Sequence, residues 1–261
     1  MVIKNTYPIL EYDESKKAVI MPNHAKLNLK LPQKCVFAFL SDFLEEFAQI
    51  KNAHVAAYFE SATKDYPIFI MDYSGKQICL VQAPVGAAAA TQIMDWLIAY
   101  GVRKIISCGC CGVLKNIPES TLLVPTMALR DEGTSYHYLS PSRFIELDRE
   151  VINKIEATFD NFGTKYEEVT TWTTDGFYRE TKDMVEYRIY EGCSVVEMEC
   201  SALAACAKFR NIQFGQILYS ADTLFDTNNW DARNWGNDAR QLVLNLSIET
   251  LIRTEKSKNG N

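Results

Sequence analysis

The chain has 261 residues, of which 48% are apolar and 23% charged, and its formal net charge is −6. These values are ordinary for a folded globular protein and exclude the disordered and fibrous classes. The acidic balance, without a block of Lys and Arg, argues against nucleic acid as a partner. No apolar run reaches the roughly 18 to 20 residues that span a bilayer, and residues 1–7 lack the apolar segment of a signal peptide. We therefore expect a cytoplasmic protein with no membrane partner.

Short apolar runs alternate with helix-period segments from about residue 35 onward. The predicted strands, many of them rich in Val, Ile and Phe, cover residues 36–40, 54–59, 66–71, 77–82, 104–108, 122–129, 168–173, 194–199 and 215–219. The clearest helix covers residues 87–100 and is followed by Gly101 as a helix stop. Further helices are predicted around residues 147–155, 181–190, 200–209 and 244–252.

The alternation of strands and helices is typical of the α/β class. It predicts a single-domain, three-layer α/β/α fold with a central mixed, largely parallel sheet. No linker, composition break or internal repeat divides the chain, so residues 1–261 are predicted to form one domain. Residues 1–34 then form an N-terminal extension, and the polar residues 255–261 a frayed tail. The eight cysteines are expected to be reduced thiols, because a core of this size needs no disulfide.

Two acidic residues, Glu197 and Glu199, come at the end of the apolar strand predicted over residues 194–199. Residues alternate across a strand, so the two carboxylates are expected on one side and Met198 on the other. One interpretation is a pair of core carboxylates satisfied by Arg or backbone donors. The other is a site that grips the vicinal hydroxyls of a sugar, because an ionised carboxylate can accept two O–H donors.

A third acid, Asp222, directly follows the strand predicted over residues 215–219. Ligands of open α/β sheets bind at the carboxyl ends of the strands. Asp222 either caps the following turn or donates a proton, and the second role needs a pKa raised by burial or by a neighbouring carboxylate.

Gly109 and Gly112 follow the strand predicted over residues 104–108 and enclose Cys110 and Cys111. Two glycines at this spacing allow a sharp turn that brings backbone N–H groups close to a ligand. The neighbouring cysteines lack a second ligand cluster with zinc spacing, and the three histidines are scattered, so no metal site is predicted.

Two further segments are candidate binding loops. Residues 130–142 are polar and rich in aromatic side chains, as functional loops on rigid scaffolds often are. In residues 171–180, Phe177 and Tyr178 follow an Asp-Gly turn, where they either stack on a planar base or pack as core residues at a helix entry.

Taken together, these segments resemble the nucleoside phosphorylase family of the uridine phosphorylase and hexameric purine nucleoside phosphorylase type. The resemblance covers about residues 35–255. The segments that carry it are Pro84-Val85-Gly86, Gly109-Cys110-Cys111-Gly112, residues 130–138 and 173–180, Val196-Glu197-Met198-Glu199 and Ser220-Ala221-Asp222. The Glu-Met-Glu segment is the most specific of them.

The resemblance implies cleavage of the N-glycosidic bond of a nucleoside by phosphate, which gives a free base and ribose 1-phosphate. It implies phosphate as a co-substrate, no organic cofactor, and a homo-oligomer, either a dimer or a hexamer. As catalytic residues it implies Glu199, which would bind the ribose 2′ and 3′ hydroxyls, and Asp222, which would protonate a purine ring. The substrate-binding residues that it implies are Glu197 and Met198 at the sugar, Gly86, Gly109, Cys110 and Gly112 around the phosphate, and Arg130, Phe177, Tyr178 and Arg179 in the matched loops.

The sequence departs from the family where phosphate is held. Residues 41–46 replace a family segment that contains an Arg, and Ser107 replaces a second Arg. These changes remove the bidentate clamp that makes Arg suited to phosphate. Arg130, Arg179 and Lys115 are candidates to replace it.

Three functions therefore stay open. Phosphorolysis is the leading prediction, a nucleosidase that uses water is the second, and a non-catalytic nucleoside-binding protein is the third. The base is also open: Asp222 favours a purine, whereas the loop that begins at Arg130 is more similar to the uridine branch.

Overall fold

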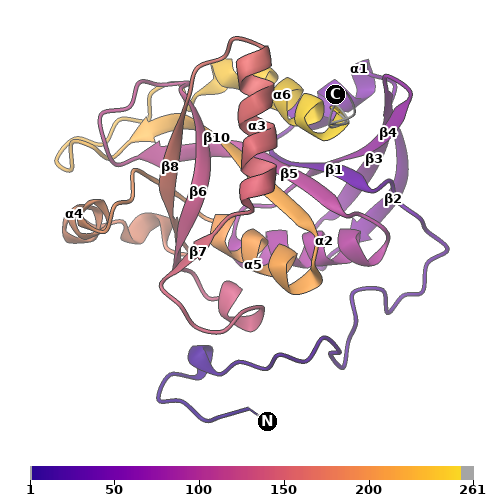
Figure 1. The fold of residues 1–261 in the computed structure, drawn as a ribbon, viewed down its shortest axis with the longest axis horizontal. Coiled ribbons are helices and arrows are strands. Elements are labelled where there is room, and N and C mark those ends of the chain that lie inside the picture. Colours follow the sequence, from indigo (N-terminus) through magenta and orange to yellow (C-terminus); the bar gives the residue numbers. More distant parts are fainter. Residues whose placement is uncertain (1, 254–261) are drawn as a thin grey trace, which may run out of the picture.

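The computed structural model describes residues 2–253, which are built around one mixed ten-stranded sheet (Figure 1). Its strands are β1 (Lys34–Phe39), β2 (His54–Glu60), β3 (Asp65–Tyr73), β4 (Lys76–Gln82), β5 (Lys104–Val113), β6 (Leu122–Asp131), β7 (Phe144–Glu146), β8 (Tyr166–Thr174), β9 (Val195–Glu197) and β10 (Gln213–Thr223). Within the described residues, five pairings between these strands are parallel and five are antiparallel. The predicted mixed sheet is confirmed, but its parallel share is smaller than expected.

Five of the strands close into a ring. The order β10-β6-β8-β9-β5 returns to its start because β5 also pairs with β10. Strands β1, β4, β3 and β2 extend from β5 as an open half-sheet, and the short strand β7 pairs with β6. Strands of the ring contribute to one buried apolar cluster, which consists of Cys111, Val113, Ile117, Leu123, Val169, Val195 and Leu218. β5 belongs to both parts of the sheet, so it joins the ring to the half-sheet.

Helices cover both faces of the sheet, which confirms the predicted three layers. The helices are α1 (Phe43–Ile50), α2 (Ala87–Ala99), α3 (Arg149–Asn161), α4 (Lys182–Tyr190), α5 (Cys200–Arg210) and α6 (Arg240–Ile252). In Figure 1, α3 and α6 lie on one face, and α2 and α5 on the other.

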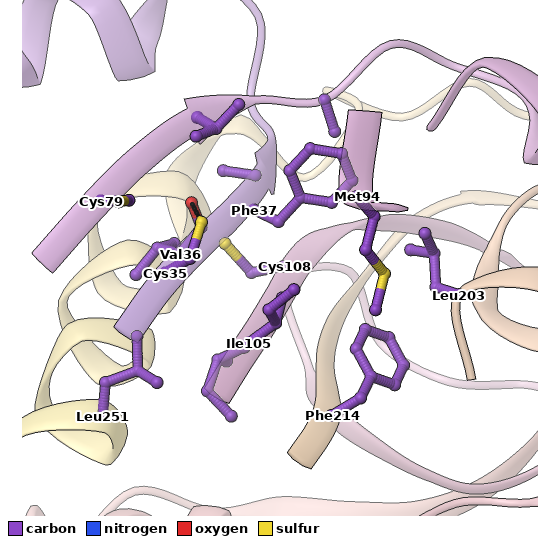
Figure 2. Close-up of a cluster of buried hydrophobic side chains, with 14 of the residues drawn as sticks. Cys35, Val36, Phe37, Cys79, Met94, Ile105, Cys108, Leu203, Phe214 and Leu251 are labelled. Carbon is purple, nitrogen blue, oxygen red and sulfur yellow. Dashed lines mark hydrogen bonds between the residues drawn. The ribbon is translucent and has the colours of Figure 1, made fainter. Parts of the chain in front are cut away.

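The core lies between these layers. Figure 2 shows side chains of β1 and β5 packed with Met94 of α2, Leu203 of α5 and Leu251 of α6. Burial of each large apolar side chain of this kind contributes roughly 1.5–3 kcal/mol. Cys35, Cys79 and Cys108 belong to this cluster and are buried, as expected for cysteines that pack as small apolar residues. All eight cysteines are free thiols.

The structure differs from the predicted elements in five places. One is β10, which continues to Thr223 and therefore contains Asp222, the residue predicted to follow the strand. β5 continues to Val113, so the segment from Gly109 to Gly112 is strand and the predicted turn is wrong. β9 ends at Glu197, so the strand predicted over residues 194–199 is wrong at its end. Helix α1 and strand β7 were not predicted.

The predicted N-terminal extension runs along the side of the molecule that carries α2 and α5 before it enters β1 (Figure 1). It contains the short 3-10 helix η1 (Pro8–Leu10). Lys16 anchors it, because its Nζ lies 2.7 Å from the Phe209 carbonyl oxygen and 3.6 Å from the centroid of the Phe209 ring. Residues 255–261 lie outside the described residues, and the single-domain organisation stays a prediction. Between residues 2 and 253, no helix combines the length and apolarity needed to cross a bilayer.

Candidate active site

Glu197 is buried and its carboxylate is fully engaged by the chain. The hydroxyls of Thr171 and Thr173 donate to Oε1 at 3.2 and 2.7 Å, and the backbone N–H groups of Glu199 and Cys200 donate to Oε2 at 2.7 and 2.6 Å. Four donors match the acceptor capacity of a carboxylate. Burial raises the pKa of Glu197, although each of these donors opposes the rise. Glu197 is thus placed to cap α5 and hold the backbone of Glu199, and the sequence-based expectation of direct sugar contact is not supported by this arrangement.

Glu199 stands at the N-cap of α5, outside the strand that carries Glu197. The sequence pattern had predicted that the two carboxylates share one face of a strand. This prediction is wrong, because Glu199 lies outside the strand. The Gly86 N–H donates to Glu199 Oε1 at 2.5 Å, and Gly86 can turn its N–H in this way because its φ is +103°, a value that favours glycine. Burial, followed by the charge of Glu197, raises the pKa of Glu199 to about 8. Glu199 keeps acceptor capacity that Glu197 has lost.

Asp222 lies inside β10, at a point where the pairing with β5 shifts register between Ser220 and Thr223. Its side chain is buried, and the indole N–H of Trp230 donates to Oδ2 at 2.8 Å. Burial raises the pKa of Asp222, while the Trp230 bond and the charge of Arg233 act in the opposite direction. A buried carboxyl of this kind holds its proton more readily than an exposed one, as a general acid must.

Gly109 and Gly112 are needed for close packing inside β5. A Cβ at Gly109 would lie 2.9 Å from Cβ of Phe39, and one at Gly112 would lie 2.8 Å from Leu224 Cδ1 and 3.3 Å from Asp222 Oδ1. Gly112 thus leaves the space that the Asp222 carboxyl occupies. This role replaces the predicted turn as the physical reason for the two glycines.

Cys110 is the exposed one of the eight thiols, and the charges of both Asp222 and Glu199 act on it. Burial raises its pKa, and the negative charges of Asp222 and Glu199 raise it further, while the positive charge of Arg240 lowers it. Both carboxyls are therefore within electrostatic reach of one thiol that is open to solvent. The structure brings together Gly86, Cys110, Glu199, Gly112 and Asp222, which the sequence had placed in four separate segments.

We expect alkylation to report on this location. Cys110 should react with iodoacetamide far more slowly at pH 7 than free cysteine and much faster near pH 10, because the thiolate is the nucleophile and its pKa is raised. Mass spectrometry of the native protein should find the label at Cys110, and C110S should remove it. Fast labelling at pH 7, or labelling of the seven buried thiols first, would contradict this description of the site.

A cavity of about 300 Å³ adjoins Asp222. One wall comes from the segment that follows β8, and the other from the chain that follows β10. The lining residues are Phe177, Tyr178, Glu180, Lys182, Val185, Asp222, Leu224, Asp226, Thr227 and Trp230. Phe177 and Tyr178 form a T-shaped pair with ring centroids 5.0 Å apart, and both are exposed, so they are not the core residues of the alternative interpretation.

Glu180 brings a second carboxyl into this cavity. It is half-buried, and it forms no hydrogen bond or ion pair with another described residue. Burial, followed by the charge of Asp222, raises the pKa of Glu180 to about 7. Two acids from distant segments therefore meet in one cavity, where at neutral pH they share fewer than two charges.

Arg130 and the loop that follows it are committed to their own structure. The Arg130 guanidinium donates to the Ser135 and Ser142 hydroxyls and to the carbonyl oxygens of Leu139 and Ser140. All of these contacts are internal to the loop, so the prediction that Arg130 contacts phosphate or substrate is not supported by the geometry.

The other cations proposed from the sequence, Lys115 and Arg179, do not line the cavity beside Asp222 either. Lys115 donates to the Ser194 hydroxyl at 3.0 Å, and Arg179 is exposed and does not line the cavity. Met198 is partly buried next to Glu199 in the chain. Within residues 2–253, no group of three or more His, Cys, Asp or Glu side chains is arranged to hold a metal ion.

Sequence reasoning missed three residues of this region: Glu180, Trp230 and Arg240. Glu180 lies in a segment that the sequence had marked, but its position in one cavity with Asp222 depends on tertiary structure. Trp230 was detectable only as an aromatic residue in the polar stretch after Asp222. Arg240 opens α6, and no local signal connects it to the site.

A larger cavity, of about 740 Å³, lies elsewhere. Its walls come from the N-terminal extension, α2, β2 and the end of α5, and it contains none of the residues Gly86, Cys110, Glu199 or Asp222. The buried acids Glu199 and Asp222 lie outside this cavity. We therefore place the candidate active site at Glu199 and Asp222.

Comparison with known proteins identifies the family of the chain. A family model described as the phosphorylase superfamily matches residues 35–253. A DeoD-type purine nucleoside phosphorylase from Bacillus cereus is 23% identical over 192 residues, which are 69% of this chain and 80% of the relative. The crystal structure of uridine phosphorylase from Vibrio fischeri aligns with a TM-score of 0.75 at 23% identity and covers 87% of this chain and 95% of that one. AMP nucleosidase from Bacteroides thetaiotaomicron aligns with a TM-score of 0.69 at 23% identity and covers 85% of this chain and 87% of that one. The chain belongs to the phosphorylase superfamily.

Proposed function

We propose that the protein cleaves the N-glycosidic bond of a purine nucleoside by phosphorolysis and releases the free base and ribose 1-phosphate. The observation that carries the proposal is the position of Glu199 and Asp222. Both are buried, both have a raised pKa, and both act on the Cys110 thiol, which is open to solvent. A phosphorylase superfamily chain with two such acids beside one open site fits the chemistry of nucleoside cleavage.

Glu199 is the sugar-binding group in this proposal. The 2′ and 3′ hydroxyls of ribose donate to its carboxylate, and these bonds favour the ionised form that burial alone disfavours. The transition state of glycosidic cleavage carries positive charge on the sugar ring, and a fixed anion beside it is stabilising. Met198 packs under the ring, while Gly86 and the β5 segment from Gly109 to Gly112, with Cys110 exposed, border the phosphate.

Asp222 is the general acid. Its raised pKa keeps a proton available for a ring nitrogen of the departing base, and proton donation of this kind typically contributes 10² to 10⁴-fold in rate. The cavity beside it provides Phe177 and Tyr178 as aromatic surfaces for the base.

A purine is favoured over a pyrimidine by the second carboxyl of the cavity. Glu180 has no partner among the described residues, and a carboxylate accepts two parallel N–H donors, such as those at the edge of a 2-amino-6-oxopurine. The relative from Bacillus cereus is a purine nucleoside phosphorylase. The name of this relative and the two carboxyls of the cavity, Glu180 and Asp222, both favour a purine.

The second candidate is a nucleosidase, in which water replaces phosphate. It is favoured by the absence of Arg from residues 41–46 and by Ser107 at the second family position, where the side chain is completely buried. The fold similarity to AMP nucleosidase is compatible with it.

One assay separates these functions. Inosine, guanosine, adenosine and uridine are incubated with and without 10 mM phosphate, and the released base and sugar are identified by chromatography. Ribose 1-phosphate formed only with phosphate supports phosphorolysis, and free ribose formed equally in both conditions supports a nucleosidase. Nucleoside binding without any turnover would identify a binding protein. Sedimentation of the same sample tests the proposed dimer or hexamer.

A further inference from the structure

The side chain of Arg240 lies over the two strands that carry the active site. Ser247 of α6 contacts Cys108 of β5, and Cys110 is the next residue on the same side of that strand. Arg240 is two turns of α6 away from Ser247 in the N-terminal direction. It interacts with the side chain of Tyr219, which is paired with Cys110 across β5 and β10. Arg240 therefore approaches the site from the α6 side.

The guanidinium of Arg240 has no anionic partner. No described carboxylate forms an ion pair with it, and its Nε is buried without a hydrogen-bond acceptor. Arg188 also has a buried Nε without an acceptor, but its other nitrogens pair with Asp131 at 2.8 Å and with Glu191 at 2.7 Å. Arg210 pairs with Asp95 at 2.7 Å. The lack of a carboxylate partner therefore distinguishes Arg240 from both. A buried charged donor without an acceptor is costly, so an acceptor is expected from a ligand.

Charges of both signs act on the Cys110 thiol. Asp222 and Glu199 stabilise the protonated thiol, and Arg240 stabilises the thiolate. Arg240 is the first residue of α6, which directly continues the short 3-10 helix η4 (Asn237–Ala239). An anion on the Arg240 side would face the positive charge that develops on a sugar held by Glu199.

We propose that Arg240 binds a phosphate group beside Cys110 and replaces the guanidiniums that the family carries at other positions. The inference rests on the proposed function for the identity of the ligand as the phosphate co-substrate. The same chemistry is offered by the 5′-phosphate of a nucleotide, and the experiment below distinguishes the two sources.

The test measures base release by the full-length protein against phosphate concentration for wild type, Arg240→Met, Arg240→Lys and Arg253→Met. Arg253 lies just beyond the other end of α6, so its substitution removes the same charge from the same helix. Arg240→Met is expected to raise the KM for phosphate at least 10-fold with a smaller effect on kcat. Arg240→Lys should recover part of the loss, and Arg253→Met should match wild type. An unchanged KM for phosphate in Arg240→Met would overturn the assignment.

Two further arms keep the test independent of the proposed function and of the folding of a variant. If wild type cleaves nucleosides without phosphate, phosphorolysis fails, and inosine is then compared with inosine 5′-monophosphate. A loss in Arg240→Met that is at least 10-fold greater for the nucleotide supports a 5′-phosphate at Arg240, and equal losses overturn the site. In wild type alone, 10 mM orthophosphate or the nucleotide should slow alkylation of Cys110. Protection by neither would also overturn it.

Discussion

Glu199→Gln is expected to lower kcat/KM for nucleoside cleavage by about 10²-fold or more while the fold is retained. Gln still fills the space and can accept the Gly86 N–H, but it removes the charge that faces the sugar ring. Loss of one preorganised group at a developing charge costs about 2.7 kcal/mol or more, which corresponds to this factor. Steady-state kinetics with the best nucleoside measures it, and Glu46→Gln on the exposed face of α1 is the control. A loss below threefold would remove Glu199 from the sugar site.

The pH dependence of the same reaction provides a second readout. The pKa of Glu199 in the free protein is about 8, so kcat/KM should rise with pH until that value as the carboxylate forms. In Glu199→Gln this rising limb should disappear. Wild-type activity that is flat between pH 6 and 8 would show that the ionised carboxylate is not the active form.

Glu199→Gln should lower activity, but it should raise the stability of the fold at alkaline pH. A carboxyl whose pKa is raised by folding costs no stability at a pH below its unfolded value. Its cost grows as the pH rises from the unfolded value to the folded value of about 8, and it stays constant above that. At pH 8.5 the free energy of unfolding of Glu199→Gln should therefore exceed that of wild type by a few kcal/mol. The variant should accordingly unfold at a higher temperature. Near pH 4.5 the difference should vanish. Thermal melts at both pH values test this, and a variant that is destabilised at pH 8.5 would contradict it.

Asp222→Asn is expected to produce the second large effect, and it should be selective for the leaving group. Without a proton donor, turnover of a natural purine nucleoside should fall by about 10² to 10⁴-fold. A nucleoside analogue with a nitrophenyl-type leaving group needs no protonation, so its cleavage should fall much less. The indole of Trp230 donates to Asp222 and can still donate to the Asn oxygen, which keeps the site assembled.

The comparison of the two substrates identifies the role. Asp226→Asn is the matched control, because Asp226 lines the same cavity and loses the same charge. Equal losses on the purine nucleoside and on the activated substrate in Asp222→Asn would reject proton donation. An equal effect of Asp226→Asn would show that total charge in the cavity, and not the acid at position 222, controls the rate.

The acids of the candidate site could be selected from the sequence because they interrupt apolar segments. Glu197, Glu199 and Asp222 stand out in sequence because charged residues are rarely buried without a reason. The separate roles of Glu197 and Glu199 were not predictable. The local composition of residues 195–200 does not show where the strand ends and the helix begins. Only the bonds from Thr171, Thr173 and two backbone N–H groups to Glu197 show which of the two acids is occupied.

The cations show the opposite case. Arg130 belongs to a conspicuous polar loop, but the loop itself accepts four hydrogen bonds from the guanidinium, because carbonyl oxygens and hydroxyls of residues 135–142 fold back onto it. Arg240 belongs to no motif, and its relation to Cys110 arises from the packing of α6 on β5. Contacts between residues more than a hundred positions apart leave no local periodicity, so sequence pattern alone does not detect them.

The closed strand ring contains or directly adjoins the two acids of the candidate site, whereas the walls of the adjoining cavity lie outside the ring. Glu199 follows β9 and Asp222 lies in β10, and both strands pair with β5, so ladder hydrogen bonds hold the acids in one frame. The walls of the adjoining cavity, at residues 177–182 and 224–230, lie outside that frame. Under the proposed function, substitutions in these walls would alter which base is accepted while the positions of Glu199 and Asp222 stay fixed, so a few mutations would be enough to change the substrate preference.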